Sequence, residues 1–444
     1  MSNAGTILII DLSARTIERI ATSGYAKEFI GGAGVAARLF TECVPSDTRA
    51  FDEKNMLIFS TGPLTGSLFG NKANVCSRAP EQPNHPYVHC GMGGQLPSEM
   101  KFAGYDHIVI KGQSEKPVYL SIYNEDVRFV DAGALWGLDV YKTQAAIRSE
   151  CQDPDVRVAC IGPAGENRIV NALILHDIEH TAARGGMGAV MGAKKLKALA
   201  VRGTKGLQVA DPKAVRKLWQ EYFDYYTKGK GRLYYQTWQR GGLARHVVDG
   251  YRYRRRKESG VYTDEIKEML SKYMVGSLGC SFCPLQCHIN YNMPGIGSGG
   301  ATCSNHGMLS GFPDQQVWWA VTNSIHKYGM ESFAVWSMLL WLQGMYQSGL
   351  ITLQDLDGIE MDKYAVEPFT AAVGKICRRE GFGEWFAEGL GKAAQKIAGG
   401  KGFKTLDWVI QSRNRPSFSM HDLAYRGFAE TGKAIRYRAG DIIA

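Results

Sequence analysis

The chain has 444 residues, of which 45% are hydrophobic and 21% are charged, so we expect a globular protein with two or three domains and a large core. Its formal net charge of +9 suits an anionic cofactor or an acidic partner, but no nucleic-acid-binding motif accompanies the basic run YRYRRRK at 251–257. The N-terminus lacks the basic and apolar regions of a signal peptide, and the longest apolar run (333–342) is about half as long as a membrane span. We therefore predict a cytoplasmic protein that does not span a membrane and does not bind nucleic acid.

The first ~200 residues are predicted to be rich in β-strands. Short runs of β-branched and apolar residues, bounded by Gly, Asp or Asn, occur at 6–12, 55–60, 107–112, 118–123, 156–162 and 198–203. Helix-like stretches such as VYKTQAAIRSEC (140–151) lie between them, and no internal repeat stands out in the residues. This pattern indicates an α+β domain with several sheets.

The pattern changes near residues 205–212. Asp211 followed by Pro212 is typical of a helix N-cap and first turn. Beyond it, apolar residues recur at steps of three and four, which predicts helices at 314–329, 331–349, 369–383 and 384–400. We therefore predict a β-rich domain at 1–208 and a mainly α-helical domain at 209–444.

Three cysteines, Cys280, Cys283 and Cys287, stand in the run CSFCPLQC with C-x2-C-x3-C spacing. Three thiolates this close in the sequence favour an iron–sulfur cluster or a zinc ion. A zinc ion would need His288 as a further ligand. The alternative is a group of structural cysteines that lie together by chance. Cys303, in the glycine-rich stretch GSGGATCSNHGMLSGFPD (297–314), is a candidate fourth cluster ligand, a ligand to a second metal, or a buried thiol. Cys377 lies in a predicted helix and is expected in the core.

Glycine-rich turns are unusually frequent in the first domain. They occur at 31–40, 61–78, 90–106, 161–168 and 184–201. With Lys72, Arg78 and Arg184 among them, they suggest close approach of the backbone to a large anionic ligand. For 184–201, a simple turn before a strand is an equal alternative to a phosphate cradle.

Seven segments together resemble the aldehyde ferredoxin oxidoreductase family, in the same order and at similar spacing. They are IGGAGVAARL, FSTGPLTG, MKFAGYDHIVIKG, IGPAGENR, ARGGMGAVMGAKKLKALAVRG, CSFCPLQC and GFGEWFAEG. The resemblance implies a β-rich domain that carries a tungsten- or molybdenum-bis-pyranopterin, helical domains that cover the metal, and an adjacent [4Fe–4S] cluster. It further implies an aldehyde or acyl-type substrate, ferredoxin or an iron–sulfur subunit as electron partner, and a possible homo- or hetero-oligomer.

The resemblance also assigns roles to residues. Cys280, Cys283 and Cys287 match the first three cluster ligands, and Lys72 stands where an arginine usually links cluster and pterin. The backbone carbonyls of Gly91 and Thr181 match those that meet the Mg²⁺ bridging the pterin phosphates. The remaining cofactor-binding candidates are Arg78, Gly93, Gly94, His180, Arg184 and Gly185.

Two motifs depart from the family pattern. HKYGME (326–331) replaces D-x-x-G-L-D, so His326 and Glu331 stand at the ends of the pterin motif and the leading carboxylate is lost. GGATCSNHG (299–307) replaces the segment with a catalytic-site glutamate and resembles the benzoyl-CoA reductase catalytic subunit branch, in which a cysteine ligates the metal. We therefore favour Cys303 as a metal ligand, with His306 as a nearby acid/base or a loop histidine.

The chain ends before the family's third domain, which supplies the fourth cluster cysteine. We therefore expect that domain to be absent, with the site completed by another chain. The alternative is a truncated, non-catalytic fragment or scaffold that retains a pterin-binding surface.

Overall fold

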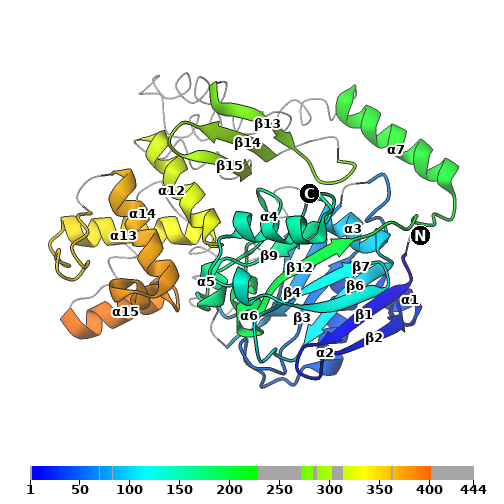
Figure 1. The fold of residues 1–444 in the computed structure, drawn as a ribbon, viewed down its shortest axis with the longest axis horizontal. Coiled ribbons are helices and arrows are strands. Elements are labelled where there is room, and N and C mark those ends of the chain that lie inside the picture. Colours follow the sequence, from blue (N-terminus) through cyan, green and yellow to red (C-terminus); the bar gives the residue numbers. More distant parts are fainter. Residues whose placement is uncertain are drawn as a thin grey trace.

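The first two hundred residues fold into two six-stranded sheets that pack face to face (Figure 1). The computed structural model describes residues 3–69, 71–82, 84–228, 272–283, 288–302, 314–361 and 364–401. The strands of the first sheet are β1 Thr6–Asp11, β2 Thr16–Ala21, β3 Leu57–Thr61, β4 Ala73–Arg78, β5 Tyr87–Met92 and β6 Tyr105–Lys111. Those of the second are β7 Val118–Tyr123, β8 Asp126–Asp131, β9 Arg157–Cys160, β10 Ile174–His176, β11 His180–Ala182 and β12 Leu196–Arg202.

The two sheets have the same topology. The first has the order β2–β1–β6–β3–β4–β5, and the second has the order β8–β7–β12–β9–β10–β11, which is the same order with six added to each number. The relative directions of neighbouring strands agree as well. In each sheet one pair is parallel, β1 with β6 and β7 with β12, and the other neighbouring strands are antiparallel. A structural repeat is therefore present that the sequence did not reveal.

Helices cover both outer faces of this sandwich. Alternate strand residues, such as Leu8 and Ile10, point into the core between the sheets, whereas Ile7 packs under the helix α2. A second outer core lies between the second sheet and α4. The helical segments are α1 Ser23–Phe29, α2 Gly32–Cys43, α3 Leu96–Phe102, η1 Gly133–Leu135, α4 Val140–Cys151, α5 Pro163–Glu166 and α6 Met187–Ala193.

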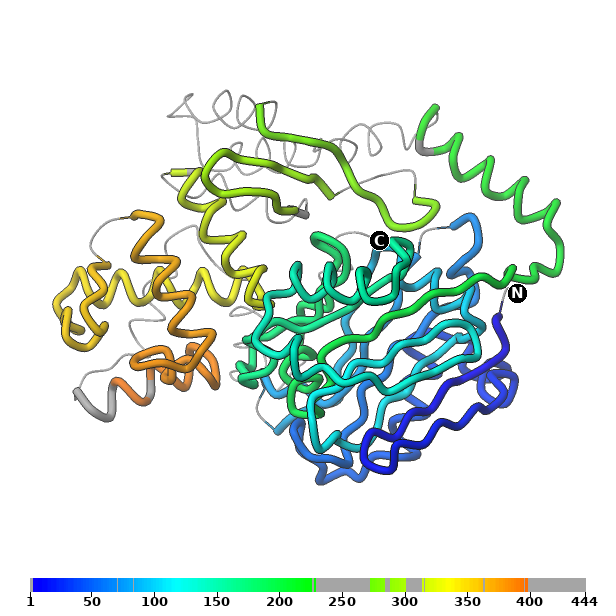
Figure 2. The backbone as a smooth tube through the Cα atoms, viewed as in Figure 1, coloured from blue at the N-terminus to red at the C-terminus, as the bar shows by residue number. Residues whose placement is uncertain are grey.

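The second half of the described chain combines helices with a small third sheet. The helices α12–α15 gather at one end of the molecule, beside the sandwich (Figure 2). The antiparallel sheet β13–β14–β15 packs on them through side chains of β14, with Tyr291 edge-on to Trp319. The elements are α7 Pro212–Thr227, β13 Met274–Leu278, β14 His288–Met293, β15 Gly297–Thr302, α12 Gln315–Lys327, α13 Ser332–Gln347, α14 Val366–Arg378, η3 Gly381–Phe386 and α15 Leu390–Lys401.

This architecture confirms the predicted α+β fold class. All six predicted strands are present, the helix at 140–151 has the predicted bounds, and the Asp211 carboxylate accepts a hydrogen bond from the Ala214 amide as the N-cap of α7. The sheet β13–β15 was not predicted, and the helix expected from residue 384 begins only at Leu390, after the 3-10 helix η3. No helix in the described ranges is long and apolar enough to cross a membrane.

The helical part docks on the sandwich through backbone contacts at the end of α12. The carbonyl of Tyr328 accepts a hydrogen bond from the Ala164 amide (3.1 Å), and the carbonyl of Gly329 accepts one from the Leu173 amide (2.8 Å). Gly162 lies directly against this contact, since a β-carbon there would stand 2.4 Å from the Tyr328 carbonyl oxygen. The absence of a side chain at Gly162 therefore permits the close approach.

We expect Gly162→Ala to lower the free energy of unfolding by about 1–3 kcal/mol, because the added methyl group overpacks a backbone contact. Its backbone dihedrals are accessible to alanine, so the cost is steric. Gly24→Ala, which meets no atom within 4 Å, is the matched control. Urea unfolding of both variants measures the effect, and equal stability of the two would contradict this account.

Candidate functional site

The first two cysteines of the motif lie directly after the strand β13. Cys280 and Cys283 are the first and last residues of a tight turn in which the Cys283 amide donates to the Cys280 carbonyl (3.0 Å). Phe282, at φ 60°, gives the turn its left-handed bend. The turn is fixed to the sandwich, because the Asn71 side-chain amide donates to the Ser281 carbonyl (2.6 Å) and the Ser281 amide donates to the Gly94 carbonyl (3.2 Å).

The loop after β5 lies against these thiols with no room for side chains. A β-carbon on Gly93 would stand 2.6 Å from the Cys280 Sγ and 3.1 Å from the His180 Cδ2. One on Gly94, which has φ +88°, would stand 2.9 Å from the His180 Cγ. One on Gly91 would meet the Lys72 Cδ at 3.6 Å. The structure thus brings together six predicted site residues: Lys72, Gly91, Gly93, Gly94, His180 and Cys280.

Burial controls the electrostatics of this loop. Burial raises the pKa of the Cys280 thiol, and Cys283 adds to the rise, whereas the Gly94 hydrogen bond and the charge of Lys72 oppose it. Burial and the neighbouring His288 and His176 lower the pKa of His180 to about 2, so its ring is neutral. This ring stacks on His288 (4.2 Å between centroids), and neither nitrogen has a hydrogen-bond partner among the described residues.

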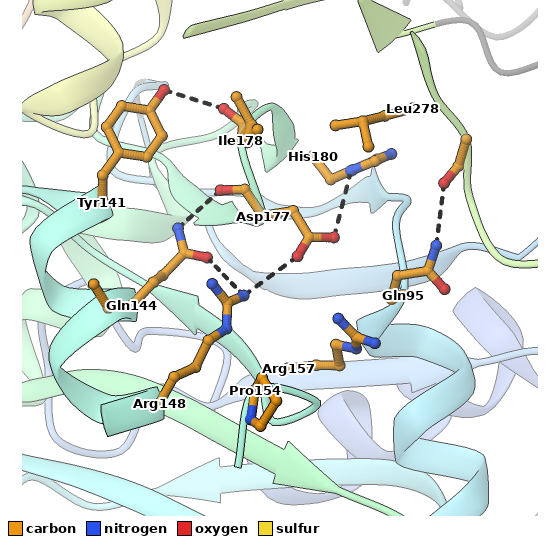
Figure 3. Close-up of a pocket in the computed structure, with 12 residues that line it drawn as sticks. Gln95, Tyr141, Gln144, Arg148, Pro154, Arg157, Asp177, Ile178, His180 and Leu278 are labelled. Carbon is orange, nitrogen blue, oxygen red and sulfur yellow. Dashed lines mark hydrogen bonds and ion pairs between the residues drawn. The ribbon is translucent and has the colours of Figure 1, made fainter. Parts of the chain in front are cut away.

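A cavity of about 560 Å³ opens beside the cysteine turn (Figure 3). It lies between α4, the start of β9 and the turn that joins β10 to β11. The polar residues around it are Gln95, Gln144, Arg148, Arg157, Asp177 and His180, and Gly279 forms the wall next to Cys280. Arg148 reaches the Asp177 carboxylate at 3.4 Å, and Gln95 donates to the Gly279 carbonyl at 3.3 Å. The cavity therefore combines apolar walls with charged and amide side chains, and it borders the cysteine turn.

A second cluster lies farther along the same edge of the sandwich, where β11 runs beside β5. The Gly185 amide donates to the Glu81 carboxylate (2.8 Å), and Arg184 lies 3.6 Å from the Glu331 carboxylate. Glu331 also caps α13 through the Ala334 amide (2.6 Å). Burial raises the pKa of both Glu81 and Glu331, and Arg184 opposes the rise. Arg184, Gly185 and Glu331 are thus assembled at the junction with the helices.

The other predicted residues lie apart from the Cys280 loop. Thr181 is paired with Leu175 in the β10–β11 hairpin, and His326 forms a buried ion pair with Glu179 (3.1 Å). Arg78 stands at the opposite end of β4 from Lys72, where it donates to the carbonyls of loop residues. Cys287, Cys303 and His306 lie outside the described residues.

Gly186, Gly188 and Gly192 pack against the backbone of neighbouring segments. A β-carbon on Gly192 would stand 1.8 Å from the Gly165 carbonyl oxygen, so α6 and α5 touch directly. Lys194 donates to the carbonyls of Asn55 and Gly112, and Lys197 pairs with Glu166. These contacts indicate that the glycines and lysines after residue 186 pack the sandwich together.

Sequence reasoning missed two residues that shape the site, His176 and Asp177. The run HDIEH (176–180) places four titratable side chains within five residues, and that density was the available signal. His176 is fully buried and hydrogen-bonds the backbone of the loop after β5. Gln95 was also missed, because its partners come from distant segments.

The residues present fit the cofactors that the sequence implies. Two reduced thiols on one turn suit a thiolate-bound cluster, although no three potential metal ligands are grouped within the described part of the chain. The side-chain-free loop at Gly93–Gly94 offers backbone groups to a large polar ligand, as does the buried His180 ring, whose nitrogens make no hydrogen bond to the described residues and whose Nδ1 lies 4.0 Å from Asp177.

Comparisons with known proteins agree with this arrangement. Residues 7–203 match the N-terminal domain of aldehyde ferredoxin oxidoreductase, and residues 227–423 match its domains 2 and 3. The tungsten-containing aldehyde ferredoxin oxidoreductase of Pyrococcus abyssi is 32% identical, over 89% of this chain and 67% of that protein. The aliphatic sulfonate oxidoreductase, WOR-like subunit, of Pyrococcus furiosus is 28% identical, over 91% of this chain and 69% of that protein.

Among solved structures, this chain is similar to one in the active-site complex BamBC of benzoyl-coenzyme A reductase with 1,5-dienoyl-CoA. The TM-score is 0.78 at 28% identity, and the match covers 90% of this chain and 64% of that one. The chain thus spans about two thirds of the length of the relatives it matches.

The His326–Glu179 pair makes stability depend on pH. Burial alone would lower the pKa of His326, but attraction to Glu179 outweighs it and the pKa is raised. The pair therefore stabilises the fold fully below the unfolded pKa of about 6.5 and loses this contribution as pH rises through the folded pKa.

We expect His326→Gln to cost about 3–5 kcal/mol at neutral pH, because Glu179 stays buried without its cation. The difference in Tm between the parent and this variant should shrink at alkaline pH. The double variant with Glu179→Gln should regain part of the loss. A Tm difference that stays constant across the pH series would refute the role of the pair.

Proposed function

Because the chain belongs to the aldehyde ferredoxin oxidoreductase family, we propose that it is a tungsten- or molybdenum-pterin enzyme that exchanges electrons between an aldehyde or acyl-type substrate and an iron–sulfur cluster. One observation carries the proposal. The Cys280 thiol touches the side-chain-free loop at Gly93, so the residues proposed for the cluster and for the pterin form one continuous surface.

In this proposal Cys280, Cys283 and Cys287 hold a [4Fe–4S] cluster. A bis-pyranopterin lies along Gly91, Gly93 and Gly94 and along the segment from His180 to Gly185. The topological repeat supports two pterins, because Gly91 lies in β5 and Thr181 in β11, which are equivalent edge strands that contact each other. Their backbone carbonyls are the proposed ligands of a bridging Mg²⁺.

When bound, the pterin-held metal supplies two-electron redox chemistry and the cluster supplies one-electron transfer. The chain's own residues position and tune these groups. Lys72 places a positive charge near Cys280 that lowers the pKa of this thiol and therefore stabilises negative charge on the thiolate. The neutral ring of His180 presents a nitrogen to a donor without adding charge. The proposed roles of Cys303 as a metal ligand and of His306 as an acid/base complete the site.

The proposal extends to domains, partners and location. We propose a pterin-binding domain at 1–208 and a cluster-bearing domain at 209–444 in a cytoplasmic protein, with ferredoxin or an iron–sulfur subunit as electron partner. Relatives of both kinds support the electron partner, since one is a ferredoxin oxidoreductase and another is part of a reductase complex.

Metal content tests the function. We expect the anaerobically purified protein to be brown and to contain iron with tungsten or molybdenum. Cys280→Ser and Cys283→Ser should each lower the iron content strongly, because a cluster loses a thiolate ligand. Cys43→Ser, at an exposed thiol at the end of α2, should leave the iron content unchanged.

A colourless protein without iron, tungsten or molybdenum would refute the proposal. If that protein also aggregated on size-exclusion chromatography, the result would favour the non-catalytic fragment instead. Zinc as the sole metal would indicate a zinc-binding protein.

Lys72 offers a second test. We expect Lys72→Gln to make the reduction potential of the cluster more negative, because a positive charge beside the thiolates favours the added electron. Lys72→Arg keeps the charge and should change the potential less. Redox titration followed by electron paramagnetic resonance measures both. Equal shifts in the two variants would show that charge is not the cause.

A further inference from the structure

We propose that His176 is the positioning residue that holds the loop of Gly93 and Gly94 against the cysteine turn. The inference rests on the proposed function, since it concerns the surface assigned there to the cofactors. His176 ends β10, on the sheet opposite the loop that it holds. Its side chain is fully buried.

The ring of His176 bridges the second sheet and the start of α3 through both of its nitrogens. Nδ1 lies 3.0 Å from the Val158 carbonyl oxygen in the neighbouring strand β9. Nε2 accepts hydrogen bonds from the backbone amides of Gln95 (3.2 Å) and Leu96 (3.0 Å). Since a carbonyl only accepts, Nδ1–H donates to Val158, and in this proposal an unprotonated Nε2 is the acceptor of the two amides.

The two amides that donate to His176 belong to the N-cap residue of α3, Gln95, and to its first helical residue, Leu96. The first amides of a helix have no partner within the helix and need an external acceptor. Gln95, the N-cap residue of α3, makes no side-chain capping bond. His176 therefore acts as the cap of α3, supplied from 80 residues away in the sequence.

This cap fixes the path of the two glycines. A β-carbon on Gly94 would stand 2.6 Å from the His176 Cδ2, so the loop lies directly on the ring. From there the Gly94 carbonyl accepts from the Ser281 amide (3.2 Å), next to Cys280. One buried ring thus determines where the loop meets the cysteine turn.

Asp177 makes the cap depend on the protonation of the His176 Nε2. One of its carboxylate oxygens lies 3.0 Å from the same Nε2. A ring protonated at both nitrogens would direct Nε2–H to that carboxylate, and the amides of Gln95 and Leu96 would lose their acceptor. The proposed role therefore belongs to the neutral ring.

Two variants separate the functions of the two nitrogens. A glutamine side chain reaches about as far as Nε2 and keeps an acceptor for α3, whereas an asparagine reaches only about as far as Nδ1 and keeps the donor for Val158. We expect the amides of Gln95 and Leu96 in His176→Asn to exchange hydrogen about tenfold faster than in the parent, and those in His176→Gln to stay closer to the parent. Ser77→Ala, which removes a buried hydrogen bond to Met56 elsewhere in the sandwich, controls for a general loss of stability.

Exchange measured by mass spectrometry on the full chain tests the inference independently of cofactor content. The inference is overturned if His176→Asn leaves this segment as protected as in the parent, or if Ser77→Ala exposes it equally. Metal analysis of the same samples adds a second readout. If the inference holds, His176→Asn should retain at most about half of the tungsten or molybdenum that His176→Gln retains. Equal metal content in the two variants would show that His176 does not position the cofactor surface. If the parent protein itself lacks these metals, the proposed function is refuted. The hydrogen-exchange measurement then decides alone whether His176 caps α3.

Discussion

The site depends on one steric constraint, the absence of side chains at Gly93 and Gly94. Three groups from distant segments converge on these two residues: the Cys280 thiol, the His180 ring and the His176 ring. A β-carbon at either glycine would come within 2.6 Å of one of them, closer than packed atoms tolerate. Because Gly94 also requires a left-handed φ of +88°, no other residue satisfies both the space and the backbone. The cysteine turn, the loop and the second sheet therefore occupy fixed positions relative to one another.

The turn between β10 and β11 extends this constraint to the rest of the molecule. From five consecutive residues, His176 reaches the loop after β5, Asp177 accepts from α4 through Gln144 and Arg148, and Glu179 pairs with His326 at the end of α12. β15 lies on the same turn, since a β-carbon on Gly300 would meet Glu179 at 2.7 Å. Both sheets of the sandwich and the helical part thus share one set of buried polar contacts, which links the geometry of the site to the docking of the helices.

Local sequence patterns predicted the features that depend on neighbouring residues, namely strands and a helix cap. The six apolar runs became strands, and Asp211 became an N-cap, because strand burial and capping depend on neighbouring residues. The matched topology of the two sheets was not predictable, since hydrogen-bond pairing between strands leaves no periodic signal when the side chains have diverged. The glycine-rich turns and the cysteine spacing, with the family resemblance, pointed to residues that lie together around Cys280 in the structure, and their role in cofactor binding stays a prediction. The role of His176 was not predictable, because its bond to Leu96 joins residues 80 positions apart.

The departure at the motif HKYGME (326–331) is compensated by a contact within the protein. The resemblance expects a carboxylate at position 326, and this chain has a histidine there. An unpaired buried cation would be costly, but Glu179 lies 3.1 Å away, and its attraction raises the pKa of His326 and so favours the charged ring. Glu331, at the other end of the motif, lies near Arg184 and caps α13. The motif therefore lies between the sandwich and the helices, and contacts within the protein engage both its first residue and its last.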